Sequence, residues 1–265
     1  VAPAVDAAVA LVRERPIDRT GSVAVRAHRI REHSTADTAA IERAVGAVLT
    51  ERGHTIDLDA PTHTLRVSCG ADRWMLGWVI ASRTGGYGSR QPARRPFFSP
   101  GSIDPIEARA AVNIAIGQRP GVVCDPLCGT GGFLIEAAAM GAQVIGGDIR
   151  PQMVAGAHEN LTALAPVAPL GIYHGDASAI PLAGQSVDAV VTDVPYGRQS
   201  PIGAATQRAL VAAVLPELAR ITSRVVLICD RRLEAPAGAL GLQAHITRRV
   251  HRSLTRHLHL FTTAR

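Results

Sequence analysis

The stretch Val122-Val123-Cys124-Asp125-Pro126-Leu127-Cys128-Gly129-Thr130-Gly131-Gly132 decides how this chain folds. Its apolar start, Val122 to Cys124, predicts a buried strand, and the glycines behind it predict a tight turn into a helix that begins at Gly132. A glycine-rich turn after the first strand of a parallel sheet commonly binds a nucleotide-like ligand, because the backbone can approach the ligand closely. The stretch therefore predicts both an α/β fold and a ligand site.

The chain beyond this turn alternates strands and helices, which is typical of a doubly wound parallel sheet. The expected strands are Val122 to Cys124, Val144 to Gly147, Gly171 to His174, Val187 to Thr192 and Val225 to Cys229. The expected helices are Gly132 to Met140, Pro151 to Leu164 and a segment around Arg208 to Ile221. Gln243 to Val250 and Leu254 to Thr262 predict a closing hairpin.

The residues before this sheet predict a small α+β module with a mixed or antiparallel sheet. The expected elements are a strand from Ser22 to Arg29, a helix capped by residues 34–37 and ended by Gly53, and strands at Leu65 to Val67 and Trp74 to Ala81. Trp74 and Trp78 are four residues apart, so they share one face of their strand and are expected in the core of the module.

Between Thr84 and Gly101 the glycines and prolines predict a linker without regular structure. Asp104 then caps a helix that has Pro105 at its first position and ends at Gly117. The linker carries Arg90, Arg94 and Arg95 beside two phenylalanines. These arginines either contact RNA phosphates or decorate a solvated segment, and we favour RNA contact.

Composition sets wider bounds on the protein. The 265 residues carry a formal net charge of +6, and all 28 basic residues are arginine. Arginine suits nucleic-acid contact because its planar fork pairs with phosphate, although a GC-rich genome also explains the absence of lysine. The four cysteines form no CxxC pair, so we expect reduced thiols, a cytoplasmic protein and no metal site. No apolar run is long enough to span a membrane. The apolar residues 1–12 do not form a convincing signal peptide, and a start at Val rather than Met leaves the N-terminus open to processing or truncation.

Three acidic residues follow three successive predicted strands. Asp125 ends the first strand, where a carboxylate would repel a pyrophosphate but attract the ammonium and sulfonium charges of S-adenosylmethionine. Asp148 ends the second strand and is placed to accept the ribose hydroxyls. Asp176 follows the third strand and is placed to accept the adenine amine. The alternative is that these acids only cap helices, which three acids at three strand ends make less plausible.

A second motif, Asp193-Val194-Pro195-Tyr196, follows the fourth strand at the same sheet edge. The amine of a nucleobase is a poor nucleophile, and acceptors for its hydrogens localise its lone pair. We expect Asp193 and the Val194 carbonyl to be those acceptors, Tyr196 to stack on the base and Pro195 to stiffen the turn. The alternative is an ordinary turn after a strand, because Asp, Pro and Gly are turn residues.

At these motifs the sequence resembles the THUMP-domain tRNA (guanine-N2) methyltransferases, above all the archaeal enzymes that modify guanosine at position 10 of tRNA. The resemblance covers most of the chain, including Val25-Arg26, Arg29-Ile30 and, in the linker, Arg94 to Phe98 with Pro100 to Pro105. It implies a Rossmann-like class I S-adenosylmethionine-dependent methyltransferase sheet, with a THUMP-like module at 1–83, a linker at 84–103 and the catalytic domain at 104–265. The cofactor residues are then Asp125, Cys128, Gly129, Thr130, Gly131, Asp148, Asp176, Ala177, Phe98, Pro100 and Ser102.

The resemblance also implies partners and an activity. It implies mono- or dimethylation of the guanine amine in tRNA, with Arg26 and Arg29 of the THUMP-like module as RNA contacts beside those of the linker. We expect a monomer, and the resemblance leaves a small helper subunit open. The alternatives are methylation of another tRNA position or of ribosomal RNA, and a non-catalytic RNA-binding homologue. An adenine-N6 methyltransferase acting on DNA would not need the first module.

Two departures from the family pattern stand out. Val194 replaces the first proline of the usual Asp-Pro-Pro-Tyr, which predicts a looser turn at a cost of about 0.4–1 kcal/mol. Only about twenty residues precede the strand at Ser22, where family members carry a longer segment. The second departure affects the expected docking of tRNA rather than the chemistry.

Overall fold

The computed structural model describes residues 2–14, 19–30, 34–70, 74–82, 86–117, 121–195, 204–233 and 240–263. The chain divides into two compact units, Val1–Thr84 and Gly85–Arg265. Within the described ranges, no helix has the length and apolar character needed to cross a membrane.

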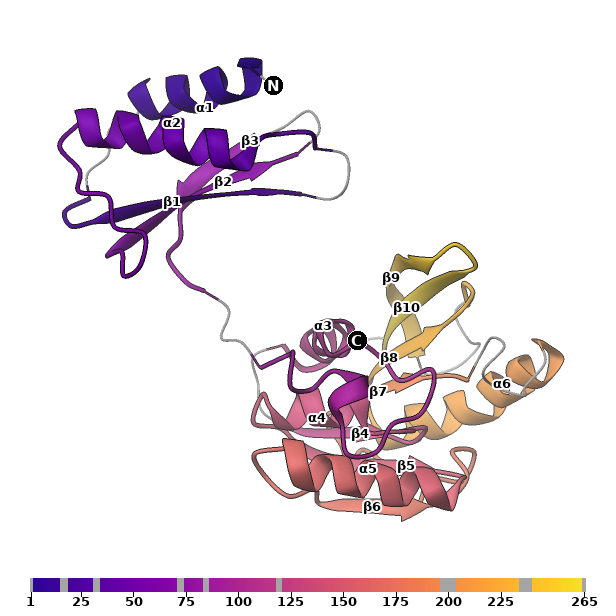
Figure 1. Cartoon of the computed structure of the whole chain (residues 1–265). Coiled ribbons are helices and arrows are strands. Elements are labelled where there is room, and N and C mark those ends of the chain that lie inside the picture. The colour runs from indigo at the N-terminus through magenta and orange to yellow at the C-terminus, as the bar shows by residue number, and fades with distance from the viewer. Residues whose placement is uncertain are drawn as a thin grey trace. The chain divides into compact units, whose positions relative to one another are not determined.

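The first unit is a three-stranded sheet with two helices on one face (Figure 1). Strands β1 and β2 pair in parallel, and β2 and β3 pair antiparallel, so the sheet is mixed as predicted. The tryptophans Trp74 and Trp78 pack against its core, which confirms their expected place. The elements are α1 (Ala2–Glu14), β1 (Val23–Arg29), α2 (Thr38–Glu51), β2 (His63–Cys69) and β3 (Trp74–Trp78).

Helix α1 was not predicted. Its signal lies in the residues at positions 5, 8, 9 and 12, whose spacing is that of one helical face. Ala8 and Val12 are buried against the core, and Val5 and Val9 pack partly against it. The apolar N-terminal residues are thus the buried stripe of an amphipathic helix.

The second unit contains a seven-stranded sheet in the order β6-β5-β4-β7-β8-β10-β9. The first five strands of this order are parallel, and β10 is antiparallel to both β8 and β9. The strands are β4 (Val122–Asp125), β5 (Gln143–Asp148), β6 (Gly171–His174), β7 (Ala189–Asp193), β8 (Arg224–Cys229), β9 (Leu240–His251) and β10 (Leu254–Thr263). This arrangement confirms the predicted α/β sheet with its closing hairpin.

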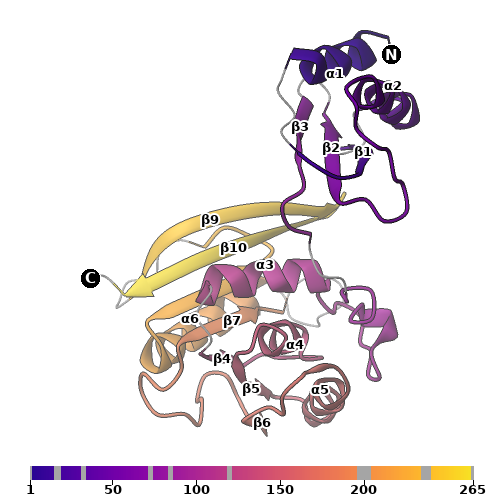
Figure 2. The ribbon, with the colours of Figure 1, turned by 90° about the vertical axis from the view of Figure 1, so that its left-hand side faces the viewer.

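Helices cover both faces of this sheet (Figures 1 and 2). Helices α3, α4 and α5 share one apolar core with inward side chains such as Val123 and Val191, and α6 shares a second core on the other face with Val190 and Leu227. The helices are α3 (Pro105–Ile116), α4 (Gly132–Ala138), α5 (Pro151–Leu164) and α6 (Ala204–Ile221). Asp104 caps α3 and Gly117 follows its end, as predicted.

The strand order reverses beside β4, whose neighbours are β5 and β7. Chain connections leave such a pair of strands in opposite directions, which opens a crevice at their carboxyl ends. Asp125 ends β4 and Asp193 ends β7. The fold therefore brings the two predicted motifs to the place where open α/β sheets bind ligands.

Candidate active site

Asp125 and Asp193 lie at the ends of directly paired strands. Val123 pairs with Ala189 and Cys124 pairs with Val190 between β4 and β7. Neighbouring strands are about 4.8 Å apart, so the two strand ends are close neighbours. The sequence predicted that both motifs lie at the same sheet edge, and the strand pairing makes them direct neighbours.

Asp125 is buried, and a residue that sequence reasoning missed holds it in place. Its Oδ1 atom accepts hydrogen bonds from the Thr192 hydroxyl at 2.7 Å and from the Leu127 amide at 3.2 Å. Burial, together with repulsion from Asp148 and Asp193, raises the pKa of Asp125 to about 8. A buried carboxylate of this kind favours a cation beside it. The signal for Thr192 was a polar residue inside an otherwise apolar strand.

Asp148 connects the second strand to the glycine loop. Its Oδ2 atom accepts from the Gly129 amide at 3.0 Å, and its Oδ1 atom accepts from the Arg150 amide at 2.9 Å. The cap position of helix α5 is Arg150, and no side chain caps that helix. The alternative of a simple helix cap therefore does not describe Asp148, which instead fixes the loop.

The glycine loop has the backbone that its sequence predicts. Gly129 and Gly131 have φ angles of 52° and 79°, in the left-handed region that favours glycine. No atom lies within 4 Å of a Cβ built on Gly129, so the loop faces open space there. Thr130 is buried, and Cys128 turns its thiol into the core, where burial raises the pKa of the thiol.

Asp176 and Ala177 follow β6. Asp176 is exposed, and its Oδ1 atom accepts from the Ser178 amide at 2.8 Å. Ala177 is buried in the core beneath α6. Asp176 thus keeps an exposed carboxylate at the same sheet edge as Asp125 and Asp148.

The predicted linker packs onto the second unit and reaches the glycine loop. The Ser102 hydroxyl lies 2.9 Å from the Thr130 hydroxyl and donates to the Ser99 carbonyl at 2.7 Å. Phe98 is 55% exposed and Pro100 is exposed. The structure thus places Ser102 at the glycine loop. Phe98 and Pro100, which are close to Ser102 in the sequence, lie on the surface.

Asn160 of α5 fixes the same segment, and the sequence analysis missed it. Its side chain accepts from the Phe97 amide at 2.9 Å and donates to the carbonyls of Phe97 and Thr130 at 2.9 and 3.0 Å. A Cβ on Gly156 would meet the Phe97 ring at 2.0 Å. The linker therefore contains close packing, and Pro92–Arg94 even forms a short 3-10 helix.

The expected RNA contact at Arg95 does not fit the structure. Arg95 is 5% exposed and donates to the Arg90 carbonyl, the Thr130 hydroxyl and the Ile103 carbonyl at 2.9 to 3.3 Å. Its guanidinium therefore has little surface to offer a phosphate. The physical reason is that the linker folds against α4, where the Arg95 guanidinium donates to acceptors inside the second unit.

Arg90 is also held inside the unit. Its Nε donates to Glu136 at 2.6 Å, and Arg109 contacts the same carboxylate at 3.0 Å. The side chains of Arg90, Arg109 and Glu136 are 14%, 21% and 1% exposed. The Arg90 guanidinium also lies over the Tyr87 ring at 4.9 Å. Arg90 thus belongs to an ion-pair cluster around the buried Glu136 carboxylate. The sequence analysis did not predict this cluster.

The other predicted RNA contacts are more accessible. Arg94 is exposed at the end of the 3-10 helix. In the first unit, exposed Arg29 donates to the Ala36 carbonyl at 2.9 Å, and half-buried Arg26 donates to the Leu58 carbonyl at 2.5 Å. These three residues stay predictions as RNA contacts.

The segment after Asp193 is tied to the sheet and to α6. The Val194 amide donates to the Ile228 carbonyl at 2.9 Å, and Val194 itself is buried. The Pro195 carbonyl accepts from Nε2 of Gln207 at 3.4 Å. Gln207 is buried and was missed, since a lone glutamine in a helix gives no sequence signal. Tyr196 lies outside the described residues.

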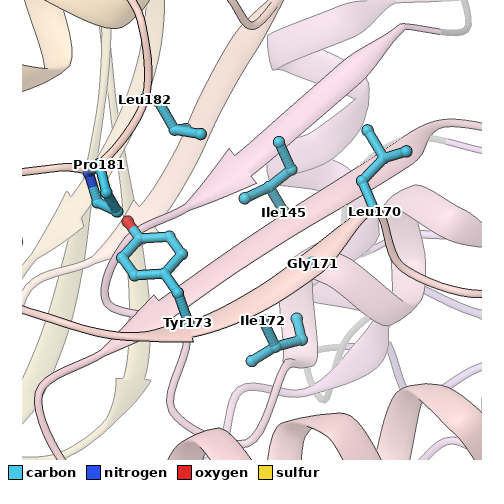
Figure 3. Close-up of a pocket in the computed structure, with 7 residues that line it drawn as sticks. All are labelled: Ile145, Leu170, Gly171, Ile172, Tyr173, Pro181 and Leu182. Atoms are coloured by element: carbon cyan, nitrogen blue, oxygen red, sulfur yellow. The ribbon is translucent and has the colours of Figure 1, made fainter.

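A pocket of about 230 Å³ lies against strands β5 and β6 (Figure 3). Its lining is apolar apart from Tyr173, whose hydroxyl oxygen is buried without a hydrogen-bond partner in the described part of the chain. The lining residues are Ile145, Leu170, Gly171, Ile172, Tyr173, Pro181 and Leu182. No carboxylate lines this pocket, so it does not match a cationic ligand.

The carboxyl edge of the sheet does match the expected S-adenosylmethionine. Three carboxylates there suit an ammonium group and sugar hydroxyls, and the open space over Gly129 allows close approach. The residues present therefore fit this group.

Comparisons with known proteins agree with this geometry. Residues 92–257 match the family of RMKL-like methyltransferase domains, and residues 5–79 match the THUMP domain. The matched ranges correspond to the two units of the structure. The first-unit sheet with its two helices is thus a THUMP domain.

Relatives of known activity cover most of the chain. It is 33% identical over 231 residues to the tRNA (guanine(10)-N2)-dimethyltransferase of Methanothermobacter thermautotrophicus, covering 83% of this chain and 67% of that protein. It is 30% identical over 256 residues to the enzyme of the same name from Methanocaldococcus jannaschii, covering 92% of this chain and 72% of that protein.

Solved structures support the fold. TrmN from Thermus thermophilus matches with a TM-score of 0.54 at 22% identity, over 98% of this chain and 78% of that chain. A possible methylase from Clostridium difficile 630 matches with a TM-score of 0.55 at 14% identity, over 98% of this chain and 81% of that chain. With its THUMP domain, its RMKL-like methyltransferase domain and these relatives, the chain belongs to the family of THUMP-domain tRNA (guanine-N2) methyltransferases.

Proposed function

We propose that this protein transfers a methyl group from S-adenosylmethionine to the exocyclic N2 amine of a guanosine in tRNA, at position 10. The observation that carries the proposal is the placement of Asp193 beside Asp125, at the ends of paired strands. The relatives named as tRNA (guanine(10)-N2)-dimethyltransferases support the choice of base and position, and their names favour two successive methylations.

The carboxylates at the sheet edge divide the work. Asp125 and Asp148 would hold the charged and ribose parts of the cofactor, and exposed Asp176 would accept from its adenine amine. When bound, S-adenosylmethionine supplies an electrophilic methyl group on a sulfonium. Burial of Asp125 excludes water from one side of the site and strengthens its attraction to a cation.

Asp193 would act on the guanine amine. Its carboxylate would accept a hydrogen bond from the amine and localise the nitrogen lone pair toward the methyl group. The bond from the Val194 amide to the Ile228 carbonyl fixes the start of the following turn, so the acceptor groups keep one orientation. Alignment of this kind contributes up to about 7–11 kcal/mol to lowering a barrier.

Transfer of labelled methyl from S-adenosylmethionine to unmodified bulk tRNA, followed by nucleoside analysis, tests the proposal. We expect label in N2-methyl- or N2,N2-dimethylguanosine, and primer extension should place it at position 10. Label at another guanosine of tRNA would change the assigned position, and label in methyladenosine would change the assigned base. Cofactor binding without transfer to any RNA would indicate a non-catalytic homologue or a required helper subunit.

Asp193→Ala tests the assigned role. We expect a loss of roughly 10²–10⁴ in kcat with near-normal cofactor affinity, because the hydrogen-bond acceptor of the amine disappears while the cofactor carboxylates stay. Asp188→Asn is the matched control, since Asp188 directly precedes the other end of β7 and its carboxylate accepts from the Val122 amide at 2.7 Å. Parental turnover by Asp193→Ala would show that the assignment is wrong.

A further inference from the structure

The closing hairpin extends beyond the sheet to which it belongs. Strand β10 pairs with β8 only from His257 to Thr262, but it pairs with β9 from Leu254 onward. Residues 248–256 therefore pair only with each other, past the last residue of β8, Cys229. Figure 2 shows the two strands as a long ribbon beside α3.

The direction of this extension follows from the strand pairing. Cys229 is the carboxyl end of β8, and β8 is parallel to β7, which carries Asp193 at its own carboxyl end. His257 lies opposite Cys229, so the hairpin tip projects past the edge that holds the active-site carboxylates. Three strand spacings of about 4.8 Å separate β7 from β9, so the tip lies roughly 15 Å to one side of the Asp193 strand.

The hairpin has a one-sided charge. Between Leu240 and Thr263 the chain contains four arginines, four histidines and no acidic residue. Arg249 and Arg252 are exposed, and in the described ranges neither has a salt bridge to a carboxylate. Two guanidinium groups thus face solvent at the projecting tip.

The other two arginines hold the hairpin in place. Arg248 and Arg256 lie directly opposite each other in the strand pairing, where like charges repel. Both donate to the carboxylate of Glu107 on helix α3. Glu107 therefore offsets the repulsion and fixes the hairpin against a helix whose N-terminus adjoins Ser102.

We propose that the tip of the β9–β10 hairpin, residues 248–253, is an RNA-contact surface in which Arg249 and Arg252 bind backbone phosphates a few nucleotides from the target guanosine. This inference rests on the proposed function, because it concerns the RNA that brings its base to Asp193. A nucleic-acid strand carries a phosphate every few ångströms, so a tip roughly 15 Å to the side meets the backbone a few nucleotides from the target. Arginine pairs with phosphate through two parallel hydrogen bonds. An acidic protein would use the same charges but gives no reason for their place at the active-site edge.

The double variant Arg249→Gln/Arg252→Gln tests this surface by tRNA binding across a series of salt concentrations. We expect affinity for an unmodified tRNA transcript to fall about 10- to 100-fold, since two charged hydrogen-bond donors are removed. The slope of log affinity against log salt should decrease by about 2, because two phosphates are no longer neutralised. Affinity for S-adenosylmethionine and the melting temperature should stay at the parental values.

Two controls keep the result specific. Arg249→Lys/Arg252→Lys retains both charges and should restore the salt slope and much of the affinity, whereas Gln243→Ala removes only an exposed amide of β9 outside this surface and should change nothing. Unchanged tRNA affinity and salt slope in the glutamine variant, while the parent methylates tRNA, would overturn the hairpin surface and leave the proposed function intact. A parent that neither binds nor methylates tRNA would overturn both.

Discussion

Two groups of arginines in the same unit have opposite fates. Arg90 of the linker segment is half-buried and pairs with Glu136, and Arg95 is buried and bonds to Thr130 and two backbone carbonyls. Arg249 and Arg252 of the hairpin are exposed and have no carboxylate partner among the described residues. The sequence predicted an RNA contact for the first group, because its run borders the catalytic cleft in the inferred layout. A charged side chain indicates an external partner only when the folded protein does not already provide its counter-charge.

The largest test of this comparison is Glu136→Gln. Removing the shared carboxylate leaves Arg90 and Arg109 without their counter-charge, so we expect the second unit to lose about 3–5 kcal/mol of stability. Both tryptophans lie in the first unit, so far-UV circular dichroism during denaturation should shift while tryptophan fluorescence stays parental. Exposed Glu159→Gln on α5 is the control. Equal stability of both variants would show that the linker arginines need no internal partner.

Arg95→Gln sharpens the same contrast. We expect a loss of about 1–3 kcal/mol, because the variant leaves buried acceptors at Arg90, Thr130 and Ile103 without their donor. Urea titration of the variants measures this loss. Arg94→Gln, at an exposed position, should stay within about 0.5 kcal/mol of the parent in its free energy of unfolding. If Arg95→Gln kept full stability but lost tRNA affinity, Arg95 would return to the RNA surface.

Asp125 is the anionic counterpart, a buried charge whose partner has to come from outside. Its pKa, raised to about 8 by burial, exceeds the ordinary value, so the folded state holds a proton that the unfolded state releases. Stability of the ligand-free protein should therefore fall as pH rises from about 4 to 8, and Asp125→Asn should flatten that fall in thermal melts.

The same pKa shift predicts proton release on cofactor binding. A cation beside Asp125 favours its charged form, so binding near neutral pH should release up to about one proton. Calorimetry in buffers of different ionisation enthalpy measures this number. A heat that is the same in all buffers would contradict the assigned contact.

The smallest effect belongs to the hairpin. Arg249→Gln and Arg252→Gln should each change the free energy of unfolding by less than about 0.5 kcal/mol, because exposed residues without partners contribute little. A denaturant titration of each variant checks this. A loss of about 2 kcal/mol or more would show that these residues make structural contacts, as the linker arginines do.

Much of the fold was predictable because its signals are local. Apolar runs marked the strands of the second unit, and Asp104, Pro105 and Gly117 marked both ends of α3. Boundaries moved by a few residues, as where β3 ends at Trp78 rather than Ala81. Helix α1 was missed because its apolar residues were considered only as a leader sequence, although their helical spacing was present.

The site was predictable where it depends on strand ends and not where it depends on packing between distant segments. Asp125 and Asp193 followed from their positions at the carboxyl ends of predicted parallel strands. Asn160, which lies 63 residues from its partner Phe97, and Gln207 gave no local signal. Their roles exist only after α5 and α6 have packed on the sheet.

Strand β9 has a consequence for self-association. It is twelve residues long and forms the outer edge of the described sheet, so its backbone offers a template for pairing with a strand of another molecule. Charged side chains along such an edge oppose that pairing, and Arg248 and Arg249 stand there. Arg249, which we propose binds RNA, thus also opposes strand pairing between two molecules, so an RNA that neutralises its charge would need to cover the same edge.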